Sequence, residues 1–94
     1  MALVVTARAQ TDIHDALEHY DELDEQLAQR WLLELQGLYE NIQAHPGMYR
    51  VVHRQVRRVV FRRFPHAVFY RLDGEDQTIL RVLHARSDPA QWPT

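Results

Sequence analysis

Residues 67–83 read AVFYRLDGEDQTILRVL, and this stretch decides the fold. Its two halves, residues 67–72 and 77–83, are rich in aromatic and β-branched side chains, which favour strands. The sequence Asp73-Gly74-Glu75-Asp76 between them predicts a hairpin turn, because an Asp-Gly pair tolerates a positive φ angle. We therefore expect two adjacent antiparallel strands in the second half of the chain.

Two further strands are expected outside this hairpin. Residues 56–64 combine Val59, Val60 and Phe61 with arginines, and Phe64-Pro65-His66 predicts the turn that follows, since proline cannot donate within a central ladder. Near the start of the chain, the short run of residues 3–6 is apolar and β-branched and predicts a buried first strand.

Between these strands the apolar residues recur at helical spacing. A first helix is indicated by Ala9, Ile13, Ala16, Leu17 and Tyr20, with Asp12, Asp15 and Glu18 expected on its outer side. A second helix is indicated by Leu27, Ala28, Trp31, Leu35, Leu38 and Ile42. Residues 21–24 are the expected link, and His45-Pro46-Gly47 is the expected end of the second helix.

This order of elements predicts an α+β fold in one domain spanning residues 1–94. A two-helix hairpin would pack on one face of a small, mostly antiparallel sheet of four strands, in the order β-α-α-β-β-β.

Composition excludes several kinds of function. The 94 residues include no cysteine, which excludes disulfides, thiolate catalysis and cysteine-based zinc sites. Three glycines and a single serine, Ser87, give neither a glycine-rich phosphate loop nor a serine nucleophile motif. The six histidines lack metal-ligand spacing, so we expect no metal and no cofactor. With no long apolar run and no signal peptide, the expected location is the cytoplasm, away from membranes.

Charge is distributed unevenly along the chain. Residues 1–47 carry nine carboxylates and two arginines, a net −7, whereas residues 48–94 carry nine arginines and four carboxylates, a net +5. All eleven cations are arginine, a preference that a GC-rich genome also produces, but the split between the halves has no such explanation. It predicts a basic surface in the second half that meets nucleic acid or an acidic protein.

Alternation in the 56–64 strand places Arg58, Val60, Arg62 and Phe64 on one face and Arg57 on the other. In the last strand it places Leu80, Val82 and His84 together, opposite Ile79, Arg81 and Leu83. We expect a concave basic surface that binds phosphate or carboxylate, made of Arg58, Arg62, Arg81 and Arg86. The alternative is a solvated face whose arginines pair with Asp73, Asp76 and Asp88. His84 is either a proton-transfer group or a satisfied core histidine.

Several segments, in this order, resemble the ParE/RelE superfamily of type II toxin–antitoxin toxins. They are the pattern Ala9-x-x-Asp12-Ile13-x-x-Ala16-x-x-x-Tyr20 and the segments HPGMY (45–49), VRR (56–58), RRFPHAVFY (62–70) and VLHARSDPAQW (82–92). The resemblance covers nearly the whole chain and implies a helical hairpin against a small antiparallel sheet. It also implies a partner, a small antitoxin whose C-terminal segment wraps the toxin.

The superfamily has two mechanisms, and the residues resemble the ParE branch, whose members are plasmid stabilisation toxins. ParE-like toxins inhibit DNA gyrase and are not nucleases, whereas RelE-like toxins cleave mRNA on the ribosome. The nuclease branch typically has an arginine where this chain has Ala67, a lysine-rich second strand, and a C-terminal tyrosine where this chain has Trp92. The resemblance therefore implies a gyrase inhibitor without catalytic residues.

Three readings of function follow. For a gyrase inhibitor, we expect the residues that bind the target or the antitoxin to be Arg57, Arg58, Arg62, Arg81, Arg86 and Trp92. For a RelE-like endoribonuclease acting on the ribosome and mRNA, the catalytic charge would come from Arg58, Arg62, Arg81, His84 and Arg86. The third reading is an inactive toxin-like domain kept as a binding module.

Overall fold

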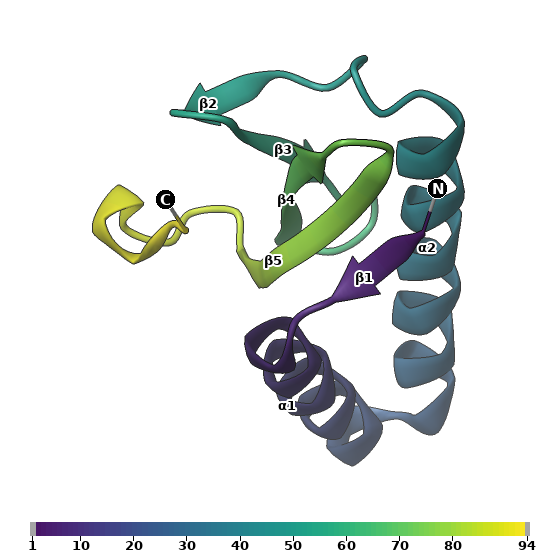
Figure 1. Cartoon of the computed structure of the whole chain (residues 1–94). Helices are drawn as coiled ribbons and strands as arrows, with labels where there is room; N and C mark the ends of the chain where they lie inside the picture. Colours follow the sequence, from purple (N-terminus) through teal and green to yellow (C-terminus); the bar gives the residue numbers. More distant parts are fainter. Residues whose placement is uncertain (1, 94) are drawn as a thin grey trace.

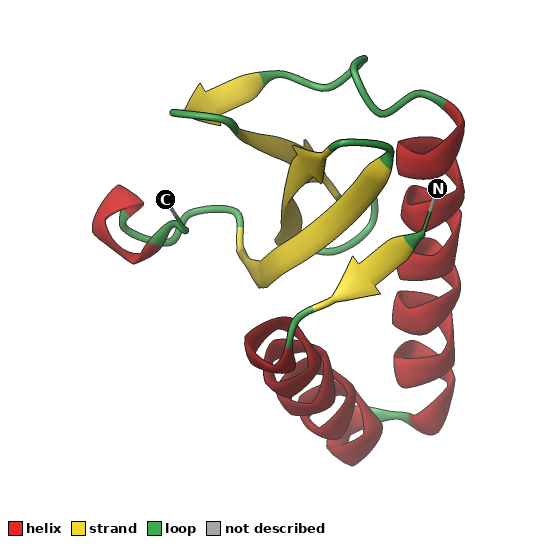
Figure 2. Ribbon diagram, in the orientation of Figure 1, coloured by secondary structure: helices red, strands yellow, loops and turns green. Residues whose placement is uncertain are grey.

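The computed structural model describes residues 2–93. Its elements, in chain order, are β1 (Leu3–Val5), α1 (Ala7–Leu23), α2 (Glu25–Ala44), β2 (Val51–His53), β3 (Val56–Val60), β4 (His66–Asp73), β5 (Asp76–His84) and the short 3₁₀ helix η1 (Pro89–Gln91) (Figure 1). The two helices form a hairpin beside a curved sheet, and the chain after β5 leaves the sheet on the side away from α2 (Figure 2). The predicted α+β fold is confirmed. Within residues 2–93, neither helix combines the length and apolarity needed to cross a bilayer.

The sheet has the strand order β1-β5-β4-β3-β2. β1 runs parallel to β5 and all other pairs are antiparallel, so the expectation of a mostly antiparallel sheet is confirmed. The expected number of four strands was wrong, because β2 adds a fifth at the edge. Its three residues, Val51–His53, pair with β3 through an irregular register, and Arg54 turns the chain back with a φ of 51°. So short a strand leaves no alternating pattern in the sequence.

The β4–β5 hairpin has the predicted turn. Asp73 pairs with Asp76, and Gly74 takes a φ of 63°, the left-handed conformation that a two-residue hairpin loop requires. Further along, Leu80 is an extra residue on β5, because Phe69 pairs with Arg81 and Tyr70 with Ile79.

That bulge changes the faces of β5. Ile79 and Val82 both contribute to the core under the helices, whereas simple alternation placed them on opposite faces. The expected face assignment for the last strand was therefore wrong, since a bulge shifts the alternation by one residue.

Single side chains begin both helices. Thr6 accepts the N–H of Ala9 and starts α1, which therefore begins earlier than the apolar pattern indicates. Asp24 accepts the N–H of Gln26 and starts α2 directly after α1 ends. The link between the helices is thus a single extended residue, shorter than the predicted 21–24.

The main core lies between the helices and the sheet. The predicted apolar stripe of α2 is confirmed there, and the largest fully buried side chains are Trp31, Tyr70, Leu35, Ile42 and Ile79. A smaller cluster covers the opposite face of the sheet, which we call the open face. It consists of Val56, Ala67 and Phe69, covered in part by residues 85–93, which we call the C-terminal strap. Ala85 and Trp92 are the strap residues that pack against this cluster.

Candidate functional site

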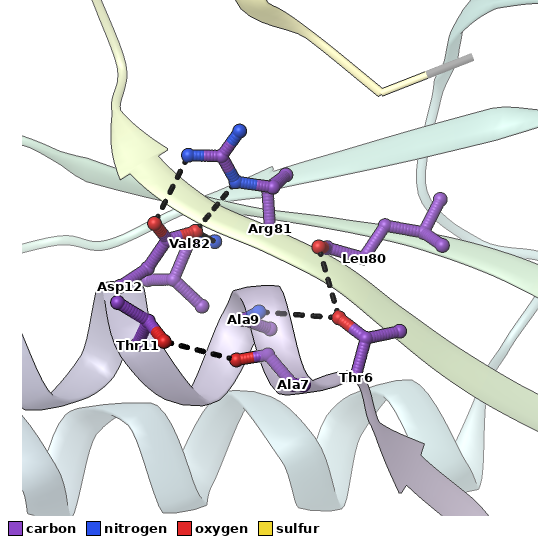
Figure 3. A network of polar contacts seen from close by, with 8 residues as sticks. All are labelled: Thr6, Ala7, Ala9, Thr11, Asp12, Leu80, Arg81 and Val82. Atoms are coloured by element: carbon purple, nitrogen blue, oxygen red, sulfur yellow. Dashed lines mark hydrogen bonds and ion pairs between the residues drawn. The ribbon is translucent and has the colours of Figure 1, made fainter.

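Helix α1 closes the edge of β5 where β1 ends. Thr6 donates its N–H to the carbonyl of Ile79 and its hydroxyl to the carbonyl of Leu80, both over 3.1 Å. Six residues further along the chain, in α1, the Asp12 carboxylate accepts the N–H of Val82 over 3.0 Å (Figure 3). Side chains of α1 therefore satisfy strand groups that would otherwise lie unpaired at a sheet edge.

Asp12 also binds Arg81 through two hydrogen bonds. The Arg81 Nε lies 2.7 Å from one carboxylate oxygen, and a terminal nitrogen lies 3.0 Å from the other (Figure 3). This hydrogen bonding raises the pKa of Arg81 above its ordinary value. Asp12 was expected on the outer side of its helix, and Arg81 was expected to offer free charge. Both expectations were wrong, because the two side chains neutralise each other.

Arg58 lies flat on the open face. Its guanidinium carbon is 6.0 Å from the centre of the Phe69 ring and 5.5 Å from the Trp92 ring, and the two rings are 5.3 Å apart. A terminal nitrogen donates to the Ala85 carbonyl over 2.8 Å. These contacts fasten the C-terminal strap to the sheet through a tilted aromatic contact, cation–π attraction and one hydrogen bond.

Two donors of this arrangement have no acceptor among the described residues. They are the Nε of Arg58 and the Nε1 of Trp92, both shielded from solvent. A buried donor without an acceptor is costly, so an acceptor brought by a partner would relieve both groups. Arg86 lies on the strap with its side chain exposed. The open face and its strap thus combine Arg58, which is bonded to the strap, with the exposed Arg86 and with an aromatic surface.

Arg62 lies away from the open face. β3 ends at Val60 and not at residue 64, because Phe61 stacks on Trp31 with ring centres 5.1 Å apart. The Glu34 carboxylate of α2 accepts the N–H groups of both Arg62 and Arg63, which holds the loop against the helix. The expected common surface of Arg58 and Arg62 was therefore wrong.

The loop and α2 border a hollow of about 480 Å³, which we call the arginine groove. Its apolar floor includes Leu33, 66% exposed, and Leu38. Its rim carries three arginines, Arg30, Arg62 and Arg63. Glu40 also lines the groove, and Glu34 is already engaged by the loop.

Arg57 has a local role. It donates to the carbonyl of Tyr49 over 2.6 Å and to that of Gly47 over 3.2 Å. These bonds fix the connection between α2 and β2. In strand register Arg57 is opposite Tyr70, whose side chain lies in the main core, so it is separated from the open face that Arg58 occupies.

Comparison with known proteins assigns the family. The sequence profile described as the ParE toxin of the type II toxin–antitoxin system parDE matches residues 3–89. The chain belongs to the ParE toxin family. It is also similar to a solved structure of the chromosomal ParDE toxin–antitoxin system from P. aeruginosa, with a TM-score of 0.78 and 25% sequence identity. The alignment covers 89% of this chain and 95% of that one. A comparison with curated proteins gave no match.

The nuclease residues expected for a RelE-like enzyme converge only in part in this ParE family member. Arg58 and Arg81 share the open face, because both pair with Phe69 in strand register, but Arg81 is neutralised by Asp12. Arg62 lies at the arginine groove, and Arg86 lies exposed on the strap. His84 is exposed, and its Nδ1 accepts the N–H of Arg86 over 3.1 Å. All four tyrosines pack on the helix side, in or against the main core.

His66, which the sequence placed in a turn, is a half-buried residue at the start of β4. Its Nδ1 accepts the indole N–H of Trp31 over 3.3 Å, so this nitrogen carries no proton. Burial, together with the smaller effects of the neighbouring His84 and His19, lowers the pKa of His66 to about 4. The strand position of His66 was not predicted, because the adjacent Pro65 indicates a turn. Within residues 2–93, no three histidine or carboxylate side chains are grouped to hold a metal.

Proposed function

We propose that this ParE family chain acts in the cytoplasm as a toxin that inhibits DNA gyrase and is neutralised by a ParD-type antitoxin. Membership of the parDE family supports the toxin role and the antitoxin partner. Similarity to a chain of the P. aeruginosa ParDE system supports the same pairing. The observation that favours a binding inhibitor over a nuclease is the bidentate Asp12–Arg81 pair, which removes a central charge from the expected catalytic set.

A phosphate-cleaving site needs several charges directed at one point. Here Arg58 donates to the backbone of the strap, Arg81 on the same face of the sheet is paired with Asp12, and Arg62 lies at the arginine groove. Tyr70 is fully buried, and burial raises its pKa to about 12. No tyrosine of the described chain packs in the open-face cluster beside Arg58. This arrangement suits recognition and does not suit proton transfer.

The open face is the surface we assign to the target. Arg58, Arg86 and Trp92 offer cationic and aromatic contacts, and two shielded N–H groups there lack acceptors. An acceptor-rich, acidic surface of a protein target would meet both needs.

The arginine groove is the surface we assign to the antitoxin. An acidic amphipathic helix could place apolar residues on Leu33 and Leu38 and carboxylates near Arg30, Arg62 and Arg63. The cleft between α1 and α2, by contrast, is lined by Glu18, Asp21 and Glu25. An acidic segment therefore suits the arginine groove better than it suits this cleft.

The test is a supercoiling assay with purified chain and purified gyrase, run in parallel with a ribosome-dependent mRNA cleavage assay. We expect supercoiling to fall with increasing toxin, recovery on adding the antitoxin encoded beside it, and no mRNA fragments. Cleavage of mRNA with normal supercoiling would overturn the proposal in favour of the nuclease. Inactivity in both assays, together with normal growth on expression, would favour the inactive binding module.

A further inference from the structure

Another hollow, of about 580 Å³, lies beside the C-terminal end of α2. It opens where the C-terminal end of α2 meets the β4–β5 turn. Its lining comes from Glu40, Gln43, Ala44, Pro46, Glu75 and Gln77. Apart from Glu40, none of these residues lines the arginine groove.

The charged residues that line this hollow are both acidic. Glu40 and Glu75 line it from α2 and from the hairpin turn, and no basic residue lies in the last turn of α2. The end of a helix carries partial negative charge on its free carbonyls, so a nearby carboxylate without a cation is unfavourable. Among the described residues, neither carboxylate has a hydrogen bond or an ion pair.

Gln77 gives an independent indication of a missing donor. Its side chain is buried, with the residue 6% exposed, and it lines the same hollow. The amide nitrogen donates to the Glu75 carbonyl over 3.0 Å, which fixes the amide orientation. The amide oxygen has no donor among the described residues. A buried acceptor of this kind is rare and calls for a partner.

We propose that this hollow binds the guanidinium group of an arginine from a partner polypeptide. A guanidinium carries one positive charge and five N–H donors in a plane, so it can reach two carboxylates and an amide oxygen that lie on separate elements. A bare metal ion fits less well, because no three carboxylate or histidine side chains of residues 2–93 are grouped to hold one.

The hollow is held in place before any partner arrives. The Tyr70 hydroxyl donates to the Pro46 carbonyl over 2.7 Å, which fixes the chain after α2 to the sheet. Gly74 sets the turn that carries Glu75. A preformed site loses less entropy on binding, which favours recognition of a single side chain.

The probe is n-butylguanidinium, added to the isotope-labelled full chain while the amide signals of Gln77 are followed by NMR. We expect a saturable shift of the Gln77 side-chain amide and of the backbone amides at 75–77. Neutral n-butylurea, which has nearly the same shape, is the ligand control. We expect E40Q and E75Q each to weaken binding about threefold and the double variant about tenfold, as for partly exposed charge pairs. E22Q, an exposed carboxylate at the end of α1, should change nothing.

Three results would overturn the proposal. They are an equal response to n-butylurea, unchanged guanidinium binding in the double variant, and a response to calcium ions without one to guanidinium. The spectrum of each variant reports whether it is folded, and Q77L provides a second check. Replacing the unpaired amide by an apolar group should leave the chain folded and remove the binding. The proposed gyrase inhibition is argued from the open face and not from this hollow, so the two proposals are tested separately.

Discussion

Asp12 satisfies two groups at once, the backbone N–H of Val82 and the guanidinium of Arg81. The three residues come from elements separated by about seventy positions in sequence, so no local pattern indicates that they meet. From sequence, Asp12 belongs to the solvent face of a helix and Arg81 to a basic strand. The arginines were therefore correctly recognised as the notable residues of the chain, but their individual roles depend on partners that only the tertiary structure brings together.

We predict that Asp12→Asn lowers the free energy of unfolding by about 1–3 kcal/mol, because one amide oxygen cannot replace two carboxylate oxygens and the Arg81 charge is left half-buried. Urea unfolding measures the change. Asp15→Asn on the exposed side of the same helix is the matched control and should shift stability by less than about 0.5 kcal/mol. Equal effects of the two substitutions would show that the network contributes nothing.

His66 makes stability depend on pH. Its pKa is lowered to about 4 in the folded chain, against 6.5 for an unperturbed histidine, so the unfolded chain binds more protons between these values. The contribution of His66 to the free energy of unfolding is complete above pH 6.5 and is lost as the pH falls towards 4. The free energy of unfolding changes through this group by at most about 1.4 kcal/mol per pH unit.

Denaturant unfolding at several pH values tests this directly. We expect His66→Gln, which keeps an acceptor for Trp31, to flatten the slope between pH 6.5 and 4. His53→Gln, at an exposed position on β2, should leave the slope as it is. An unchanged slope in the His66 variant would mean that groups other than His66 are responsible.

At the scale of elements, periodicity predicted the helices and the hairpin well, and boundaries less well. The stripe of α2 and the Asp-Gly turn are local features, and both are confirmed. The end of β3 and the bulge at Leu80 are not local. Glu34 of α2 and the Trp31 ring hold the chain after Val60, and the strand pattern of residues 56–64 contains no sign of either contact.

Gly37 gives a test of helix α2. It lies inside the helix with a negative φ, and a Cβ added there would meet no atom within 4 Å. We predict that Gly37→Ala raises the free energy of unfolding by about 0.5–1 kcal/mol, because alanine restricts the unfolded chain more than glycine does. Thermal unfolding measures this gain. A loss of stability would mean that the helix is strained at this point.

The C-terminal strap gives a second test. We predict that Trp92→Ala lowers stability by about 1–2 kcal/mol, because it removes the ring that covers Phe69 and Arg58. Gln91→Ala, at an exposed neighbouring position, is the control and should be neutral. Hydrogen exchange adds a local readout. Loss of the Trp92 contacts should speed exchange of the Ala85 backbone amide, while Trp31 and the main core stay protected. Equal exchange in both variants would contradict the role assigned to Trp92.

At the scale of the whole molecule, the helical hairpin is acidic and the sheet with its strap is basic, as the charge split along the sequence predicted. The structure places Arg58 and Arg86 at the open face and its strap, and it places Arg62 and Arg63 at the arginine groove together with Arg30 of α2. Two surfaces allow a toxin to hold its antitoxin and its target through different residues. Sequence resemblance pointed to both partners, but it did not separate the residues that face them.

Gyrase supercoiling with charge-reversed variants tests this account most directly. We expect Arg58→Glu with Arg86→Glu to reduce inhibition at least tenfold and to leave antitoxin binding intact, since the change lies on the open face only. Arg30→Glu with Arg63→Glu should do the reverse, keeping inhibition and losing neutralisation by the antitoxin. If the open-face variant is folded and still inhibits gyrase as strongly as the unaltered chain, the open face is not the target surface.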